Sequence, residues 1–103
     1  MTVEIGGYTF SGWWNNVSTL DEKSGVYAIG CEKDGKVKVL DVGESGNVQD
    51  RVEQHDRKDC WNKNCKSGTL KYAQHLTPNK QQAGRKEIEQ DIRDKVNVPC
   101  GKE

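Results

Sequence analysis

The stretch SGVYAIGCEKDGKVKVLDVGESGNVQDRVEQH, residues 24–55, decides the fold predicted for this chain. Its first part holds two runs rich in β-branched and aromatic residues, GVYAIGCE and KVKVLDVG. They are joined by KDGK, in which Asp34-Gly35 is a strong signal for a tight hairpin turn. The stretch therefore predicts an antiparallel strand pair.

The segment that follows, GNVQDRVEQHDRKDCW (46–61), predicts one helix. Asn47 is a favourable N-cap for it. At about 100° per residue, Arg51 and His55 lie on the half of this helix that also carries its two valines and faces the sheet. An inward charge is costly unless it is paired or used. The two side chains are therefore either structural, in ion pairs or reaching past the valines to water, or part of a functional site.

Outward from this stretch, VEIGGYTF (3–10) predicts a second hairpin around its Gly-Gly pair. Residues 11–25 contain mostly turn-forming residues and predict a loop that carries two tryptophans. TLKYAQHL (69–76) alternates in polarity and predicts a strand. A second helix is predicted over residues 77–97, and Pro99 ends it.

This order of elements predicts an α/β or α+β fold in one domain, 1–103. We expect a small, mostly antiparallel central sheet of about three strands, flanked by helices. Residues 1–23 would form an N-terminal hairpin and loop extension, and residues 24–101 the core.

The last helix is expected to begin at Thr77 or at Asn79, which has capping-box spacing with Gln82. Its apolar stripe consists of Ile88, Ile92 and Val96. Glu89 lies at the edge of that stripe, so a carboxylate and the Arg51 guanidinium both point inward from separate helices. They predict either an ion pair or a site for phosphate and a divalent metal ion.

Composition narrows the classes of partner. Hydrophobic residues make up 32% of the chain and charged residues 31%, and the formal net charge is zero. Nucleic-acid binding must therefore depend on a local patch. No apolar run is long enough to span a membrane, and no signal peptide is visible, so a cytoplasmic location is expected. The oligomeric state cannot be read from the sequence.

Four cysteines are present: Cys31, Cys60, Cys65 and Cys100. Without a secretion signal they are expected to be reduced thiols. The alternative is a zinc site that includes Cys60 and Cys65, whose separation suits such a site.

Several motifs in this order resemble the GIY-YIG nuclease family. GVY (25–27) resembles the first motif and DVG (41–43) an altered second motif. Arg51 and His55 have the spacing of the helix that follows, and RKEIEQDIRDKVNVPCG (85–101) resembles the C-terminal helix that bears the family's glutamate. The resemblance covers about residues 24–101 and implies a hydrolase: a metal-dependent endonuclease that cuts DNA phosphodiester bonds.

Carried over by position, the resemblance implies that Glu89 holds one Mg²⁺ or Mn²⁺ ion and that Arg51 binds the phosphate. Tyr27 would position or deprotonate the attacking water, and His55 would assist it. Asp41 stands where the family has a tyrosine. It would add a metal ligand, replace the base, or mark a domain that has lost activity.

The resemblance also suggests substrate contacts from Gly43, Ser45 and Arg85, with helix capping as the alternative for Ser45. Gly101 stands where relatives often carry an asparagine after the Pro-Cys pair. The expected function is a DNA endonuclease for repair, recombination or mobile-element processing. The alternatives are an inactive GIY-YIG-fold module that binds nucleic acid or a protein partner, and a zinc-stabilised interaction domain.

Overall fold

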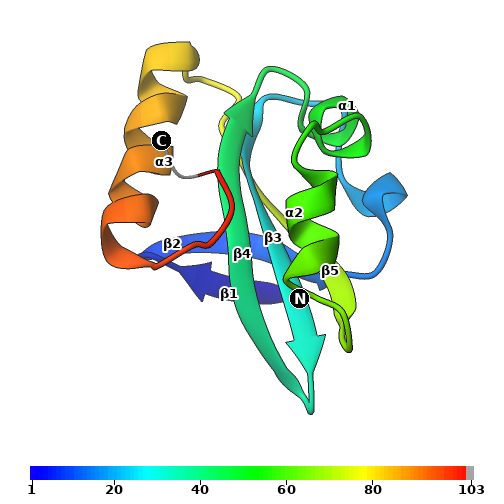
Figure 1. Ribbon diagram of the computed structural model, residues 1–103. Helices are drawn as coiled ribbons and strands as arrows, with labels where there is room; N and C mark the ends of the chain where they lie inside the picture. The colour runs from blue at the N-terminus through cyan, green and yellow to red at the C-terminus, as the bar shows by residue number, and fades with distance from the viewer. Residues whose placement is uncertain (102–103) are drawn as a thin grey trace.

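The computed structural model describes residues 1–101 and contains one antiparallel sheet with helices on both faces (Figure 1). The elements follow the order β1 (Thr2–Ile5), β2 (Tyr8–Trp14), a 3₁₀ turn (Val17–Thr19), β3 (Gly25–Lys33), β4 (Lys36–Ser45), α1 (Val48–Glu53), α2 (Lys58–Lys63), β5 (Thr69–Leu76) and α3 (Gln82–Lys95). The expected α+β class is confirmed.

The sheet has five strands in the order β1-β2-β5-β3-β4, so the expected three-strand sheet is wrong. The difference arises at β2, which pairs with β5 through Ser11 and Gln74 and through Trp14 and Tyr72. The N-terminal hairpin thus continues the sheet, and the two tryptophans predicted in a loop lie at the end of β2.

Both predicted hairpin turns are confirmed. Gly6 and Gly7 have φ angles of 59° and 90°, and Asp34 and Gly35 have φ angles of 55° and 78°. Two consecutive residues with positive φ match the twist of the flanking strands, which explains why these dipeptides connect them.

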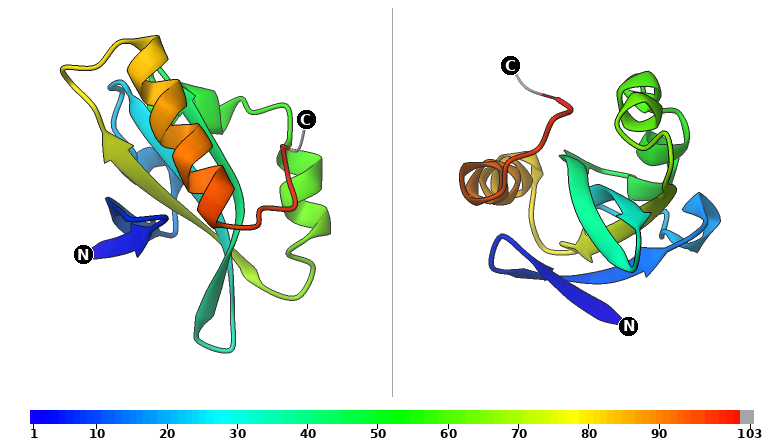
Figure 2. Two further views of the ribbon diagram at one scale, coloured as in Figure 1. Left: turned by 90° about the vertical axis from the view of Figure 1, so that its left-hand side faces the viewer. Right: turned by 60° about the horizontal axis from the view of Figure 1, so that its bottom comes forward.

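Two apolar cores lie on opposite faces of the sheet. Figure 2 shows α3 on one side of the sheet and α1 and α2 on the other. In β3, Tyr27 and Ile29 face α1 and α2, whereas Val26 and Ala28 face α3. This alternation follows from the two-residue period of a strand. Because both faces are covered, β3 is buried from Gly25 to Cys31 and gives no polar alternation in the sequence.

The predicted helix over 46–61 is wrong in its continuity, because residues 54–57 separate α1 from α2. Asn47 caps α1 as expected, and its side chain accepts from the backbone N–H of Asp50 at 3.0 Å. The break coincides with His55, whose ring accepts from the backbone N–H of Arg57 at 3.0 Å. That bond offers the backbone an alternative to the helical pattern.

The last helix also begins later than expected. Its N-cap is Gln81, with no side-chain cap, so the predicted starts at Thr77 and Asn79 are wrong. The backbone N–H of Thr77 donates instead to the carbonyl of Ser24 at 3.0 Å, which holds this residue against the start of β3. Within the described residues no helix is long and apolar enough to cross a membrane.

The cysteines form two disulfides, Cys31–Cys65 and Cys60–Cys100, so the expected reduced thiols are wrong. The alternative zinc site has no free thiolate in this form. The fold brings the paired Cα atoms to 5.6 and 5.9 Å, although the partners are 34 and 40 residues apart in the chain. The cytoplasmic expectation thereby loses the support that free thiols would have given it.

Candidate functional site

The candidate site lies on the edge strand β4, at the end where α1, α2 and α3 flank it (Figure 1). Tyr27 in β3 is paired with Gly43 in β4. A Cβ atom at position 43 would lie 2.1 Å from the Tyr27 hydroxyl oxygen. Glycine is therefore required at this position because the phenol occupies the space of a side chain.

The hydroxyl of Tyr27 lies 2.6 Å from Nε2 of His55. Because a backbone N–H can only donate, the contact from Arg57 assigns Nδ1 of His55 as the acceptor. The proton of the neutral ring is then on Nε2 and is donated to the Tyr27 oxygen. The hydroxyl proton of Tyr27 is consequently available for another acceptor.

Both groups are neutral near pH 7. Burial, reinforced by the charges of Arg51 and Arg57, lowers the pKa of His55 to about 4. Burial, reinforced by the charge of Asp41, raises the pKa of Tyr27 to about 12. The pair is thus a fixed hydrogen-bonding unit rather than an ion pair at neutral pH.

Asp41 is fully buried, and its carboxylate accepts four hydrogen bonds. Arg57 donates from Nε at 2.8 Å and from a terminal nitrogen at 3.2 Å, Trp61 donates from Nε1 at 2.8 Å, and Arg93 donates at 2.9 Å. A carboxylate has about four acceptor sites, so these bonds use all of them. In this arrangement Asp41 has no oxygen left for a metal ion.

The segment after α3 turns back toward α2, as Figure 2 shows. The backbone N–H of Cys100 donates to the carbonyl of Leu40 at 2.9 Å, and the disulfide to Cys60 fastens the segment to α2. At Gly101, whose φ is +77°, a Cβ atom would lie 2.9 Å from an Asp41 oxygen. The residue that follows the Pro-Cys pair thus lies directly over the buried carboxylate.

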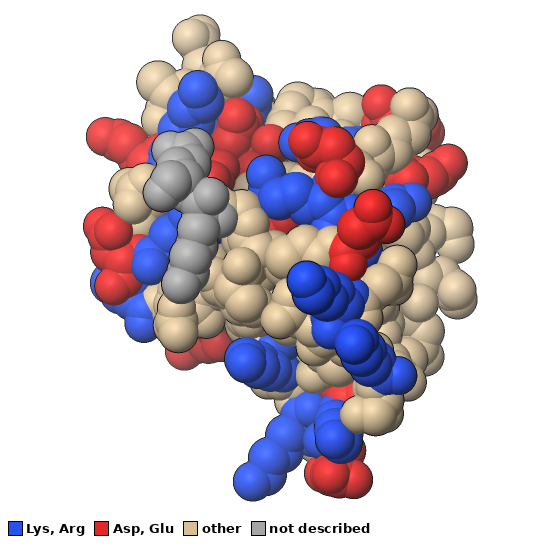
Figure 3. Space-filling model, viewed as in Figure 1, with Lys and Arg blue, Asp and Glu red and all other residues tan. Residues whose placement is uncertain are grey.

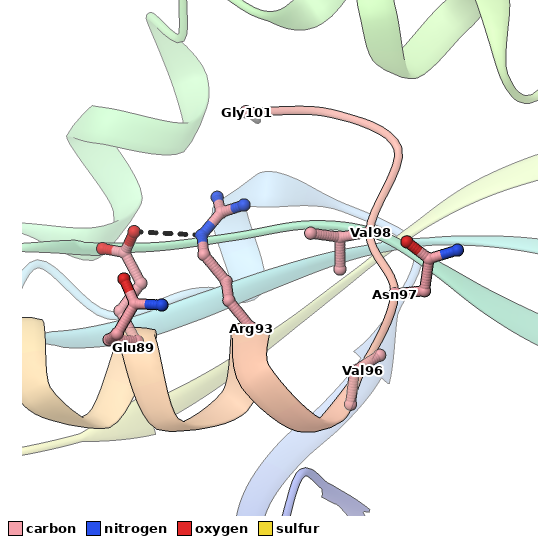
Figure 4. A pocket seen from close by; sticks show the side chains of 7 residues that line it. Glu89, Arg93, Val96, Asn97, Val98 and Gly101 are labelled. Atoms are coloured by element: carbon pink, nitrogen blue, oxygen red, sulfur yellow. Dashed lines mark hydrogen bonds and ion pairs between the residues drawn. The ribbon is translucent and has the colours of Figure 1, made fainter. Parts of the chain in front are cut away.

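Glu89 is half-buried and lines an open pocket of about 350 Å³ beside α3. Figure 4 shows its carboxylate next to the Arg93 guanidinium, with Gly101 and Asn97 at the rim. Its Oε2 accepts from Arg93 Nε at 3.1 Å, and among the described residues no donor reaches Oε1. Burial raises the pKa of Glu89 against the opposing effect of Arg93.

Arg51 is 38% exposed in its side chain and pairs with Asp56 at 3.2 Å. Within residues 1–101 no ion pair joins it to Glu89, so the ion-pair alternative is wrong. Burial has the largest effect on the pKa of Tyr27, followed by the charges of Asp41 and Arg57. Arg51 and Glu89 have smaller and opposite effects, Arg51 lowering and Glu89 raising this pKa.

The other two expected substrate contacts have protein partners. The hydroxyl of Ser45 bonds to the backbone of Asn47 at 3.0 Å in the turn before α1, so Ser45 supports the N-cap residue but does not cap the helix itself. Arg85 Nε lies 2.9 Å from Glu44 Oε2, with both side chains mostly buried.

Three residues of the site were missed from the sequence: Arg57, Trp61 and Arg93. A signal for them was present, because Asp41 lies inside an apolar strand, where a carboxylate needs partners. Arg93 is also four residues from Glu89, the spacing at which side chains meet on one helix face.

Glu89 could hold a divalent metal ion as its single protein ligand. Within the described residues no three His, Cys, Asp or Glu side chains group together as metal ligands. Mg²⁺ is often held by one or two carboxylates together with water and substrate phosphate oxygens. A single half-buried carboxylate with one unbonded oxygen is enough for that mode.

Comparison of the chain with protein-family models, with curated proteins and with solved structures finds no match in any of the three. The geometry around Tyr27 and the resemblance of the motifs are therefore the basis for assigning a function.

Proposed function

We propose that this chain is a metal-dependent endonuclease that hydrolyses DNA phosphodiester bonds at a site around Tyr27. The observation that carries the proposal is the Tyr27 hydroxyl, held by His55 at 2.6 Å over Gly43 with its own proton available. These groups come from the motifs that resemble the GIY-YIG family.

The role of Tyr27 in this proposal is to position the attacking water. A phenol whose pKa is raised to about 12 holds its proton at neutral pH, so it is a poor general base. It can still orient a water molecule or a phosphate oxygen through its free proton. His55, neutral because burial lowers its pKa to about 4, keeps the phenol oxygen in place.

Arg51 is the cation that remains for the phosphate. The guanidinium groups of Arg57 and Arg93 are held by Asp41, whereas the partner of Arg51 is Asp56, a side chain that is 76% exposed. An exposed pair of this kind is weak and exchanges readily. A phosphate can therefore replace Asp56 and accept two hydrogen bonds from the guanidinium.

Glu89 would hold the Mg²⁺ or Mn²⁺ ion through its unbonded oxygen. When bound, such an ion stabilises negative charge on the phosphate and on the leaving oxygen. The half-buried carboxylate lacks full solvation, which favours a cation beside it. Asp41 has a positioning role here: it holds Arg93, which in turn orients Glu89.

A second candidate is an inactive module of the same fold that binds nucleic acid or a protein partner. The observation that favours it is the state of Asp41, which replaces a phenol by a carboxylate whose oxygens are all engaged. Such a site lacks the second hydroxyl that the family motif would supply.

Plasmid nicking tests the proposal. The wild-type chain is expected to nick DNA with Mg²⁺ or Mn²⁺, and Glu89→Gln and Arg51→Gln are expected to abolish nicking while the fold persists by circular dichroism. Glu87→Gln is the matched control, because Glu87 is an exposed carboxylate on the same helix. If the wild type binds DNA but cuts none with either metal, the binding module is the better assignment.

A further inference from the structure

The positive charge of this neutral chain is unevenly distributed. Figure 3 shows Lys and Arg side chains over α2 and along the β3–β4 hairpin to its tip. Five lysines of this region are exposed, and within residues 1–101 none of their ammonium groups makes a hydrogen bond or an ion pair. We call them the lysine track: Lys33, Lys36, Lys38, Lys63 and Lys66.

Three members of the track lie on the same face of the sheet as Tyr27. Lys38 is paired with Cys31, and Lys36 with Lys33, in the β3–β4 ladder. Directly paired residues in antiparallel strands project to the same side. Cys31 shares the core beneath α1 and α2 with Tyr27. The hairpin lysines therefore continue the surface that begins at the candidate site.

The other two members join this surface through a disulfide. Lys63 ends α2, Lys66 follows it, and Cys65 between them is bonded to Cys31. Since Cys31 is opposite Lys38, the bond holds the end of α2 beside the hairpin. The track is thus one continuous surface on a cross-linked part of the molecule.

We propose that the track binds the phosphate backbone of duplex DNA on one side of the cleaved bond. This inference rests on the proposed function for the position of the cut. Lysines that neutralise DNA phosphates release the cations condensed on the DNA, so unpaired lysines favour a polyanion over a neutral partner. The proposal assigns the substrate class as double-stranded DNA with an arm along α2 and the hairpin.

The aromatic residues favour a duplex over a single strand. Single-stranded nucleic acid is usually bound by bases that stack on exposed aromatic rings. Among the described residues the only exposed large apolar side chain is Met1, and Trp13 and Trp14 are half-buried in the sheet. Recognition by phosphate contacts alone suits the regular backbone of a duplex.

The length of the hairpin sets the length of the arm. Lys33 is six residues beyond Tyr27 in β3, which corresponds to about 20 Å at the usual rise of a strand. Along B-form DNA this distance covers about six base pairs. We therefore expect that cleavage requires about six base pairs on one side of the cut and tolerates a shorter duplex on the other.

The test is fluorescence anisotropy with a labelled duplex at several salt concentrations in EDTA, so that binding is measured apart from cleavage. The variants are K33Q/K36Q/K38Q and K63Q/K66Q, and the control is K23Q/K80Q/K86Q, which removes exposed lysines outside the track. Each lost phosphate contact is expected to lower the slope of log K against log salt by about 0.9. Both track variants should show this loss, and the control should keep the wild-type slope.

The outcomes separate the two proposals. The proposal that the track binds DNA is wrong if the track variants keep the wild-type affinity and salt slope, or if the control variant loses as much affinity as they do. This holds even when the wild type nicks DNA. If a single strand or duplex RNA of equal length binds as tightly, the assigned substrate class is wrong. If binding depends on the track but the wild type never nicks, the nuclease proposal fails and the binding surface stands. A shared melting temperature shows that all variants are folded.

Discussion

Replacing Asp41 by asparagine tests how the site is held together. Asparagine has nearly the same size, so the change removes charge without leaving a cavity. The carboxylate now accepts bonds from Arg57, Trp61 and Arg93. An amide keeps one acceptor oxygen and turns an NH₂ group toward these donors, so the two guanidinium groups lose their counter-charge.

The expected loss follows from burial. Breaking a buried ion pair by removing one partner costs about 3–5 kcal/mol. The side chain of Arg57 is 31% exposed and that of Arg93 is 14% exposed, so water partly solvates the released charges. We therefore expect a loss near the lower end, about 3 kcal/mol. Because a domain of this kind has a free energy of unfolding of about 5–15 kcal/mol, the loss is large.

Urea denaturation at neutral pH measures this loss of stability, because the urea concentration at the midpoint of unfolding falls as stability falls. An unchanged dependence of the free energy on urea concentration indicates that the folded state is equally compact. Asp56→Asn is the control: it removes a carboxylate that pairs with an arginine at the surface, and no measurable change is expected. An Asp41→Asn variant that unfolds at the wild-type urea concentration would refute the argument that the carboxylate holds the two arginines.

Three other changes probe the same region. The pKa of His55 in the folded state, about 4, lies below its usual value of 6.5. The contribution of His55 to stability is therefore full above pH 6.5 and falls as the pH drops toward 4. Thermal melts of the wild type should show this fall, and those of His55→Gln should not. Gly43→Ala places a methyl group against the Tyr27 hydroxyl and is expected to lower the melting temperature and nicking together, whereas unchanged values of both would contradict the close packing. Replacing Cys60 and Cys100 by alanine removes a disulfide between residues 40 positions apart. We expect the free energy of unfolding, measured by urea denaturation, to fall by about 4 kcal/mol. A fall below about 1 kcal/mol would mean that the cross-link adds little stability.

Local chemistry explains which parts of the fold were predictable. The Asp34-Gly35 and Gly6-Gly7 turns were recognised because a positive φ at two successive residues is a property of the dipeptide itself. The buried stripe of α3, with Ile88 at 5% exposure, followed from the helical period in the same way. Such features need no information from distant parts of the chain.

The break between α1 and α2 was not predictable in this way. His55 leaves the helical pattern where its ring bonds to Tyr27, which lies 28 positions earlier in the chain. Helix propensity over residues 46–61 is a local property and does not depend on that contact. The same reason explains the missed arginines, since Arg93 reaches Asp41 across 52 positions.

The sequence by itself determined the two hairpins and the apolar faces of the helices, and it named Tyr27, His55 and Glu89 among its candidates. Only the tertiary structure decided that β2 joins β5, that the cysteines pair as they do, and that two arginines form ion pairs with Asp41. The physical reason is range: turns and helix faces depend on neighbours within a few positions, whereas strand order, disulfide pairing and buried charge depend on contacts that exist only after the chain has folded.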